Sequence, residues 1–263
     1  MKNLDRLICN LNRARSAKVP LLIIALVAVI AFSMAACNPG FGSGGGTQPG
    51  GGGQTNPGGN NGGFDSVTGL ANKLAWLKIN AQSGGNYVIE VSDNEIIESQ
   101  ELSYPGKYNI TITLRGIGSN RIISLSSTSY SISMFEVGSG VTLVLENNIT
   151  LYGNKQSGHG VEIRNNGTFT MNGGSVSGFD GHGVYLGEEK SVSTSIFNMK
   201  GGNISNNMSG VIVEQGCTFT MTGGTISNNT ALYGGGVYVD SRGTFNNNYP
   251  SGIYGNRLVL HEG

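Results

Sequence analysis

The chain has 263 residues, of which 44 are glycine and only 12% are charged. This composition excludes a helical bundle and favours turn-dense β structure. Residues 1–36 hold five basic residues and one acid, so the rest of the chain carries 11 basic against 15 acidic residues, a net charge of −4. Such a balance offers no basic surface for nucleic acid, and we expect no nucleic-acid partner.

The first 36 residues have the pattern of an export signal. A basic stretch precedes an apolar run from Val19 to Phe32, which is too short for a membrane span and has the length of a signal-peptide core. Small residues then precede Cys37, as in a bacterial lipobox, although Met34 stands where leucine is commonest. This resemblance implies cleavage after residue 36 and a membrane-anchoring lipid on Cys37. The alternatives are an uncleaved N-terminal anchor and an ordinary cleaved signal peptide.

Residues 37–64 are predicted to be a flexible tether that starts at the lipidated Cys37. Positions 38–64 contain no charge and 13 glycines, and such a segment cannot bury apolar surface. Its expected reach is roughly 30 Å for a random coil of this length. Because Cys9 would be removed and Cys37 modified, Cys217 would remain alone, and no disulfide is expected.

Residues 65–84 are predicted to contain a capping helix. Leu70, Leu74 and Leu77 fall on one stripe at helical spacing within 66–80, and the Ser-Gly-Gly at 83–85 ends the pattern. A single amphipathic helix needs a surface to cover. We therefore expect it to close the first edge of the β structure that follows.

Residues 85–263 are predicted to form the β domain, because they contain internal repeats. Three passages, 167–178, 195–206 and 217–228, align without gaps, and each leads to a short apolar third strand. The anchor position of the repeat recurs with spacings of 26, 28, 22 and 26 residues, at Leu143, Phe169, Phe197, Phe219 and Phe245.

A repeat with three strands and three turns fits a coil whose equivalent strands stack about 4.8 Å apart. One turn of such a coil cannot bury its inward side chains, whereas stacked turns form a continuous interior. Alternating segments at 87–91, 110–114, 122–125 and 135–137 would supply earlier turns. The predicted fold is an all-β, right-handed parallel β-helix solenoid of about six or seven rungs, with Gly and Asn at turn positions that need positive φ.

The last part of the repeat region departs from the pattern. Phe245 begins a rung, but Asn246–Pro250 does not continue as a strand, and no cap is recognisable before Gly263. Either a degenerate rung closes the coil, or the chain is truncated relative to longer relatives. The second interpretation includes a truncated, inactive copy.

Passages built on Gly-Thr-Phe-Thr-Met-x-Gly-Gly-Thr-Ile-Ser-x-Asn and Gly-Gly-Gly-Val-Tyr-Val resemble the repeats of right-handed β-helix (pectin-lyase-like) proteins. They are most similar to repeat-bearing lipoproteins of treponemes and related spirochaetes. The resemblance covers residues 70–245 and implies the fold and a cell-envelope location, as an outer membrane lipoprotein that is periplasmic or surface-exposed. It implies little about function, because this fold hosts many activities.

Catalysis on this scaffold would require carboxylates on neighbouring rungs, about 5 Å apart. Within the repeats, Glu214 and Asp240 are the acidic neighbours beside the third strand, and no catalytic motif matches residue by residue. We therefore expect no catalytic residue, no enzyme activity and no cofactor. The alternative is a polysaccharide lyase or glycoside hydrolase of the pectin-lyase-like fold.

His159 and His182 precede equivalent third strands, so their side chains are expected to stack on adjacent rungs, with Asp180 nearby. Two imidazoles and a carboxylate form a weak candidate for a transition-metal site. We favour a ladder of turn residues without a metal.

Outward-facing Tyr185 and Tyr238, with Glu214 and Asp240 in the next column, form a possible binding strip for a glycan or a protein. Phe179 and Tyr233 in nearby turns would extend its aromatic part, and the alternative is that these rings pack between rungs. Cys217 is expected to be a small buried residue. The predicted function is a lipid-anchored envelope or surface protein that presents a rigid β-helix for binding or adhesion.

Overall fold

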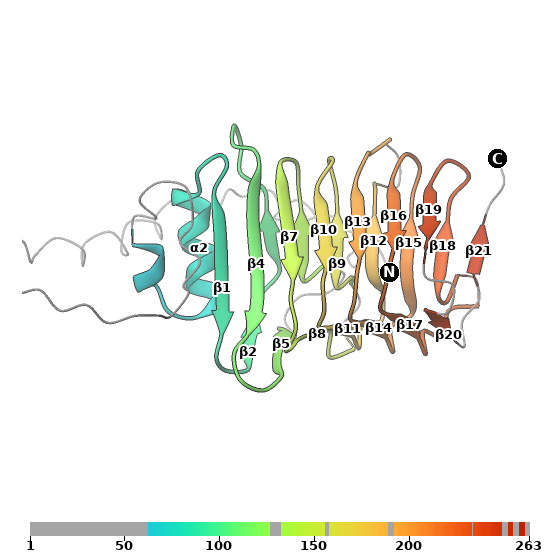
Figure 1. Cartoon of the computed structure of the whole chain (residues 1–263), viewed down its shortest axis with the longest axis horizontal. Coiled ribbons are helices and arrows are strands. Elements are labelled where there is room, and N and C mark those ends of the chain that lie inside the picture. Colours follow the sequence, from blue (N-terminus) through green and yellow to red (C-terminus); the bar gives the residue numbers. More distant parts are fainter. Residues whose placement is uncertain are drawn as a thin grey trace, which may run out of the picture. The chain divides into compact units, whose positions relative to one another are not determined.

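The computed structural model describes residues 63–126, 133–155, 158–188, 192–232, 234–248, 252–254 and 258–260. The predicted signal sequence, Cys37 and almost all of the predicted tether lie outside these residues. Within them, the chain forms a parallel β-solenoid that follows one short α-helix (Figure 1). No helix among the described residues has both the length and the apolar character needed to cross a membrane.

The described strands form three parallel sheets of seven strands each, and successive strands of the chain belong to sheets A, B and C in turn. Sheet A consists of β1 (Asn86–Val91), β4 (Ile110–Gly116), β7 (Val141–Leu145), β10 (Thr168–Met171), β13 (Ile196–Met199), β16 (Thr218–Met221) and β19 (Thr244–Asn247). Sheet B consists of β2 (Glu95–Ile97), β5 (Arg121–Leu125), β8 (Ile149–Tyr152), β11 (Ser175–Ser177), β14 (Asn203–Ser205), β17 (Thr225–Ser227) and β20 (Ile253–Tyr254). Sheet C consists of β3 (Gln100–Leu102), β6 (Phe135–Val137), β9 (Val161–Ile163), β12 (His182–Leu186), β15 (Ser209–Val213), β18 (Val237–Val239) and β21 (Leu258–Leu260).

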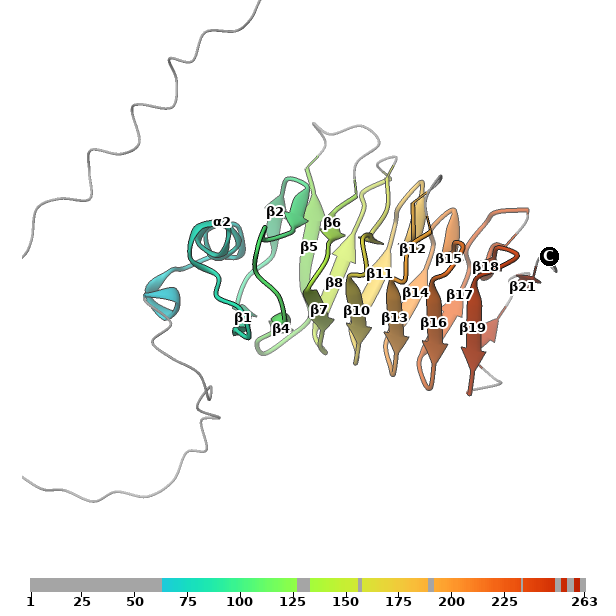
Figure 2. The same cartoon turned by 90° about the horizontal axis from the view of Figure 1, so that it is seen from above.

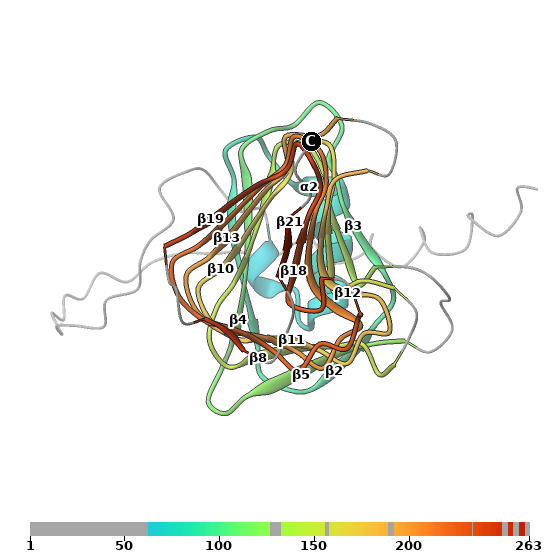
Figure 3. The same cartoon turned by 90° about the vertical axis from the view of Figure 1, so that its right-hand side faces the viewer.

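The coil is right-handed. Figure 3 looks along it from the β21 end, with sheet A on the left, sheet B below and sheet C on the right. The chain passes from A to B to C while it advances toward the viewer, which is a counter-clockwise path. The predicted right-handed parallel β-helix is therefore confirmed.

Equivalent side chains stack in the interior, as the repeat predicts. Phe169 pairs with Phe197 and Phe197 with Phe219 in the register of sheet A. Their ring centroids are 5.1 and 4.8 Å apart, and all three rings are fully buried. Because each rung repeats the same inward residues, the interior is one continuous apolar core along the coil.

The turns after sheet B explain why Gly and Asn recur in the sequence. Gly178, Asn206 and Asn228 follow β11, β14 and β17, with φ of +76°, +58° and +56°. Glycine adopts this left-handed conformation freely, and asparagine tolerates it better than most residues do. The predicted turn chemistry is confirmed at these positions.

The helix α2 (Leu70–Asn80) lies beside β1 at the first end of the coil (Figures 1 and 2). Leu70, Leu74 and Leu77 are buried, as predicted from their stripe. The carboxylate of Glu95 accepts the backbone N–H of Leu70 at 3.0 Å, which ties the start of the helix to β2.

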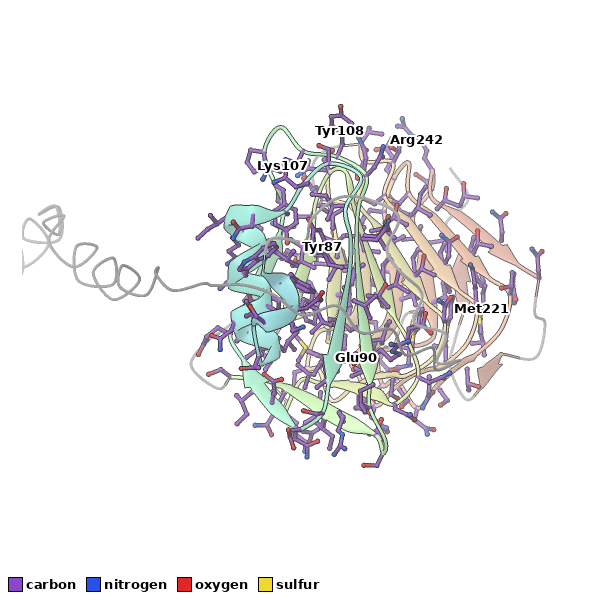
Figure 4. All side chains as sticks on the ribbon, turned by 60° about the vertical axis from the view of Figure 1, so that its left-hand side comes forward. Tyr87, Glu90, Lys107, Tyr108, Met221 and Arg242 are labelled. Atoms are coloured by element: carbon purple, nitrogen blue, oxygen red, sulfur yellow. The ribbon has the colours of Figure 1, made fainter. Side chains whose placement is uncertain are left out.

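The helix begins later than the predicted residue 66. A 3₁₀ turn, η1 (Phe64–Ser66), comes first, and Gly69 with φ +80° separates it from α2. The Tyr87 ring of β1, which lies beside α2 in Figure 4, packs against Phe64 and Trp76, with ring centroids 5.3 and 6.3 Å apart. The helix therefore covers the edge that β1 would expose, as expected of a cap.

The expectation that Asn246–Pro250 fails to continue the strand is wrong for its first residues. Asn246 and Asn247 belong to β19 and pair with Thr220 and Met221 of β16. Parallel pairing uses backbone groups, so asparagine is accepted once Phe245 stacks on Phe219, at a centroid distance of 4.8 Å. Residues 249–251 lie outside the described residues.

Candidate functional site

The outward face of sheet C brings most of the candidate residues into one column. The middle outward position of six consecutive strands is occupied, in order, by Glu101, Glu136, Glu162, Tyr185, Ile212 and Tyr238. Tyr185 and Tyr238, predicted to face outward on third strands, share this column. The column divides into an acidic part on β3, β6 and β9 and an apolar part on β12, β15 and β18.

The acidic part is organised by one arginine. Arg164 places Nε 2.6 Å from a carboxylate oxygen of Glu162 and Nη1 3.3 Å from one of Glu136. The hydroxyl of Ser133 donates to the other oxygen of Glu162 at 2.5 Å. Burial raises the pKa of Glu136; Arg164 opposes this rise and Glu162 adds to it.

The sequence patterns above do not predict a cluster of Glu101, Glu136 and Arg164. Glu101 lies on β3, whose Gln-Glu-Leu sequence lacks the apolar alternation that predicts a strand. A signal was present, since Phe135-Glu136-Val137 has the same apolar-acid-apolar pattern as the third strand Val161-Glu162-Ile163. Aligning these two strands would have placed Glu136 beside Glu162.

The predicted histidine stack is confirmed. The rings of His159 and His182 are parallel within 9°, with centroids 4.7 Å apart, and Tyr185 stacks against His159 at 5.1 Å. Nδ1 of His159 accepts the backbone N–H of His182 at 3.1 Å. Burial lowers the pKa of each histidine to about 4, so both imidazoles are neutral at pH 7.

The stack does not have the geometry of a shared metal site. Parallel rings direct their nitrogen lone pairs along separate planes rather than toward one point, whereas metal ligands converge. Asp180 does not join the stack; it lines a different groove, described below. Across the described part of the chain, no three His, Cys, Asp or Glu side chains are grouped so that they could hold a metal ion.

The apolar part of the column forms the floor of a groove of about 520 Å³, here called the sheet C groove. The groove is lined by His182, Tyr185, Met208, Ser209, Ile212, Glu214, Ala231, Leu232 and Tyr238. The hydroxyl of Tyr185, in the floor of the groove, donates a hydrogen bond to the carboxylate of Glu214 at 3.3 Å. Burial, with Asp240 and Glu214 nearby, raises the pKa of Tyr238.

Three residues of the predicted binding strip, Tyr185, Tyr238 and Glu214, therefore meet in this groove. Asp240 lies on the rung after Glu214. The backbone N–H of Glu214 donates to the carbonyl of Leu186, and the backbone N–H of Asp240 donates in the same way to the carbonyl of Val213 on the next rung. Tyr185 is mostly covered, at 7% exposure, so Tyr238 offers the more accessible ring.

Phe179 does not extend the strip. Its side chain is 1% exposed and packs between rungs, which is the alternative to an aromatic strip. Its ring occupies the space left by two glycines of the previous rung, since a Cβ at Gly153 or Gly160 would lie 2.5 or 3.0 Å from it. Tyr233 lies outside the described residues. Cys217 is buried as predicted, and burial raises the pKa of its thiol.

Two basic side chains lie at another edge of the coil. Lys107 and Arg242 are at the edge where sheet C turns back to sheet A, with Tyr108 between them (Figure 4). Of the described residues that line the sheet C groove, none is Lys or Arg. Glu214 therefore gives the groove a negative charge, whereas Glu136 and Glu162 further along sheet C are paired with Arg164.

Comparison with known proteins found no matching family model, no matching curated protein and no matching solved structure.

Proposed function

We propose that this chain is a non-catalytic binding protein of the bacterial envelope, which holds a basic, apolar segment of a partner protein in the sheet C groove. The observation that carries the proposal is the exposure of two large apolar side chains at the groove. Leu232 is 85% exposed and Met208 42%, and both flank the column formed by Tyr185, Ile212 and Tyr238. Exposed apolar groups gathered around a groove are typical of interaction sites.

The walls of the groove support a peptide more than a sugar. Aliphatic side chains such as Ile212 and Leu232 complement aliphatic side chains of a partner, whereas a sugar needs many hydrogen-bonding groups. Tyr238 adds an aromatic ring with a polar end, a combination that is enriched in protein interfaces. A partner segment with leucine-like residues would therefore be bound best.

The charge of sheet C supports a basic partner. Glu214 lines the groove and Asp240 lies one rung further. A lysine or arginine next to the apolar anchor would meet these carboxylates and the face of Tyr238. The same charges would repel an acidic polysaccharide, the substrate class of the enzymatic alternative.

The arrangement of the acids also supports a binding role. Glu162 is engaged by Arg164 and Ser133, so it is poorly placed to exchange a proton. Glycoside hydrolysis is the second candidate because burial raises the pKa of Glu136, as a general acid requires. Incubation with oligosaccharides followed by product analysis distinguishes the two: release of shortened sugars, lost in Glu136→Gln, would favour the enzyme.

Location in the envelope rests on the predicted lipid on Cys37 and the tether that follows it. A lipid at one end and a rigid solenoid at the other would hold the groove away from the membrane. Metabolic labelling with palmitate tests the anchor. We expect labelling of the wild-type chain and none of Cys37→Ala; equal labelling of both would contradict the anchor while leaving the binding proposal intact.

Fluorescent peptides of defined composition test the groove directly. We expect a peptide of alternating Lys and Leu to bind the full-length chain, and matched Glu/Leu and Lys/Ser peptides to bind at least tenfold more weakly. Leu232→Ser should weaken Lys/Leu binding about tenfold by removing apolar contact, and Glu214→Gln should weaken it and reduce its salt dependence.

Ile96→Ser is the matched control, because Ile96 is a large exposed residue (75%) on β2, outside the residues that line the groove. Its affinity for the Lys/Leu peptide should equal that of the wild type. Equal binding of the Glu/Leu peptide, or equal weakening by Ile96→Ser and Leu232→Ser, would contradict the proposal.

A further inference from the structure

A second groove lies at the corner where sheet B turns into sheet C. Its volume is about 590 Å³, within the roughly 300–1,000 Å³ of small-ligand sites. This corner groove is lined by Tyr152, Lys155, Ser177, Gly178, Phe179, Asp180, Asn206, Asn207, Met208, Asn228 and Thr230. It shares only Met208 with the lining of the sheet C groove. Its lining is mostly amides, hydroxyls and charges, so it suits a different ligand.

One rung lacks a side chain at the corner groove, and the ring of Tyr152 lies in its place. Gly178 occupies the turn position that Asn206 and Asn228 hold on the next two rungs, all with positive φ. The ring of Tyr152 lies against this glycine, since a Cβ at Gly178 would be 2.5 Å from Cε2 and 2.8 Å from Cδ2 of the ring. Tyr152 is 36% exposed, so the ring also offers surface to solvent.

The turn beneath the groove is rigid. Asn207 is 2% exposed; its Oδ1 accepts the backbone N–H of Phe179 at 3.1 Å, and its Nδ2 donates to Val176 O at 3.2 Å and Asn229 Oδ1 at 3.1 Å. These bonds join three successive rungs. Asn206 and Asn228, the neighbours of this buried amide network, are exposed and hold their amides at the groove on adjacent rungs.

Two opposite charges flank the polar groups. Lys155 has φ +57°, a conformation that costs a lysine about 1 kcal/mol or more, and its N–H donates to Gly178 O at 2.7 Å. The backbone thus places the lysine beside Gly178. Asp180 lies two residues beyond Gly178 and also lines the groove. Because the two charges balance, the groove has no net preference for an ionic ligand.

We propose that the corner groove binds a neutral oligosaccharide, with one pyranose ring packed on Tyr152. The axial C–H groups of a pyranose carry the weak positive charge that the face of an aromatic ring attracts. The hydroxyls around the ring then bond to the amides of Asn206 and Asn228, to Thr230, and to Lys155 and Asp180, which together supply donors and acceptors. This site is independent of the peptide groove on sheet C.

Titration of the full-length chain with oligosaccharides tests the inference. Gluco-, manno- and N-acetylglucosamine oligomers are compared with oligomers of galacturonic acid, by calorimetry or by the shift in melting temperature. We expect at least one neutral series to bind and galacturonic acid oligomers to bind at least fivefold more weakly.

Gly178→Asn is the most selective variant. Asparagine tolerates the positive φ and occupies this position on the next two rungs, so the backbone can stay as it is, but its Cβ would lie where the Tyr152 ring is and would displace that ring. Tyr152→Ala removes the same stacking surface by truncation. Both should lower affinity at least tenfold, whereas Tyr108→Ala, which removes a tyrosine that is 63% exposed elsewhere, should leave it unchanged.

Absence of binding to every neutral series would overturn the inference, as would affinity that survives both Gly178→Asn and Tyr152→Ala. Stronger binding of galacturonic acid oligomers would do so as well. Urea unfolding of each variant, compared with that of the wild type, serves as the check that the variant is folded.

Discussion

The imidazole rings of His159 and His182 lie face to face, with centroids 4.7 Å apart and planes inclined by 9°. Burial lowers the pKa of both from 6.5 to about 4, so the folded chain excludes protons that the unfolded chain binds. The stability associated with the neutral pair is complete above pH 6.5 and is lost as the pH falls from 6.5 toward 4. We expect the free energy of unfolding in urea to decrease across this window.

Two substitutions isolate this effect. His182→Phe keeps an aromatic ring in the stack, and His159→Asn keeps an acceptor for the N–H of His182; the double variant should lose most of the pH dependence. Glu136 acts in the opposite direction, because its raised pKa makes protonation favour the folded state, so Glu136→Gln should steepen the loss. A double variant that loses stability as steeply as the wild type would show that other groups are responsible.

Arg164 forms ion pairs with the carboxylates of Glu136 and Glu162, and Glu162 is buried. Glu162 is 6% exposed, and the Arg164 side chain is 41% exposed, so removal of the arginine leaves a carboxylate that water reaches poorly. Arg164→Met should cost about 2–3 kcal/mol of unfolding free energy at pH 7, less than a fully buried pair. Part of this loss should return as the pH falls, because the raised pKa of Glu136 allows this carboxylate to take up a proton.

Arg115→Met is the matched control for that variant. Arg115 pairs with Glu90 across β1 and β4, and the two side chains are 52% and 53% exposed. Such exposed pairs contribute at most about 1 kcal/mol. Equal destabilisation by the two substitutions in urea titrations would contradict the assignment of Arg164 as the organiser of the acidic column.

Phe197 is the centre of the aromatic column in the interior. It stacks on Phe169 and Phe219 and is fully buried, so Phe197→Ala removes two ring contacts and leaves a cavity. We expect a loss of about 3–5 kcal/mol in chemical denaturation. Thr220→Ala, on the outward face of β16, should change stability by less than about 0.5 kcal/mol. Similar losses for the two variants would contradict the column as a source of stability.

The interior of the fold is predictable because its signal repeats. Phe169, Phe197 and Phe219 recur at the same place in successive passages, and only stacked turns bury all three. The short strands β2 and β3 carry no comparable signal. Ile96 is apolar yet points outward at 75% exposure, so the alternation that marks a strand is lost there.

The candidate site is only partly predictable, for a different reason. The order of Glu162, Tyr185 and Tyr238 follows from the repeat register, and the structure places them in that order. How deeply each side chain is buried depends on where the neighbouring rungs have glycine instead of a side chain. Phe179 turns inward because Gly153 and Gly160 leave room for it, and Tyr152 is exposed beside Gly178. Such pairings across rungs are set by tertiary packing rather than by local pattern.

The central claim is that the sheet C groove receives a basic, apolar peptide. Photo-cross-linking measures this most directly: a Lys/Leu peptide with a benzophenone group is bound to the full-length chain, irradiated, and the adducts are mapped by mass spectrometry. We expect adducts at Met208, Leu232 and Tyr238, suppressed by excess unlabelled peptide. Adducts spread over all three sheets, or unaffected by the competitor, would contradict the claim.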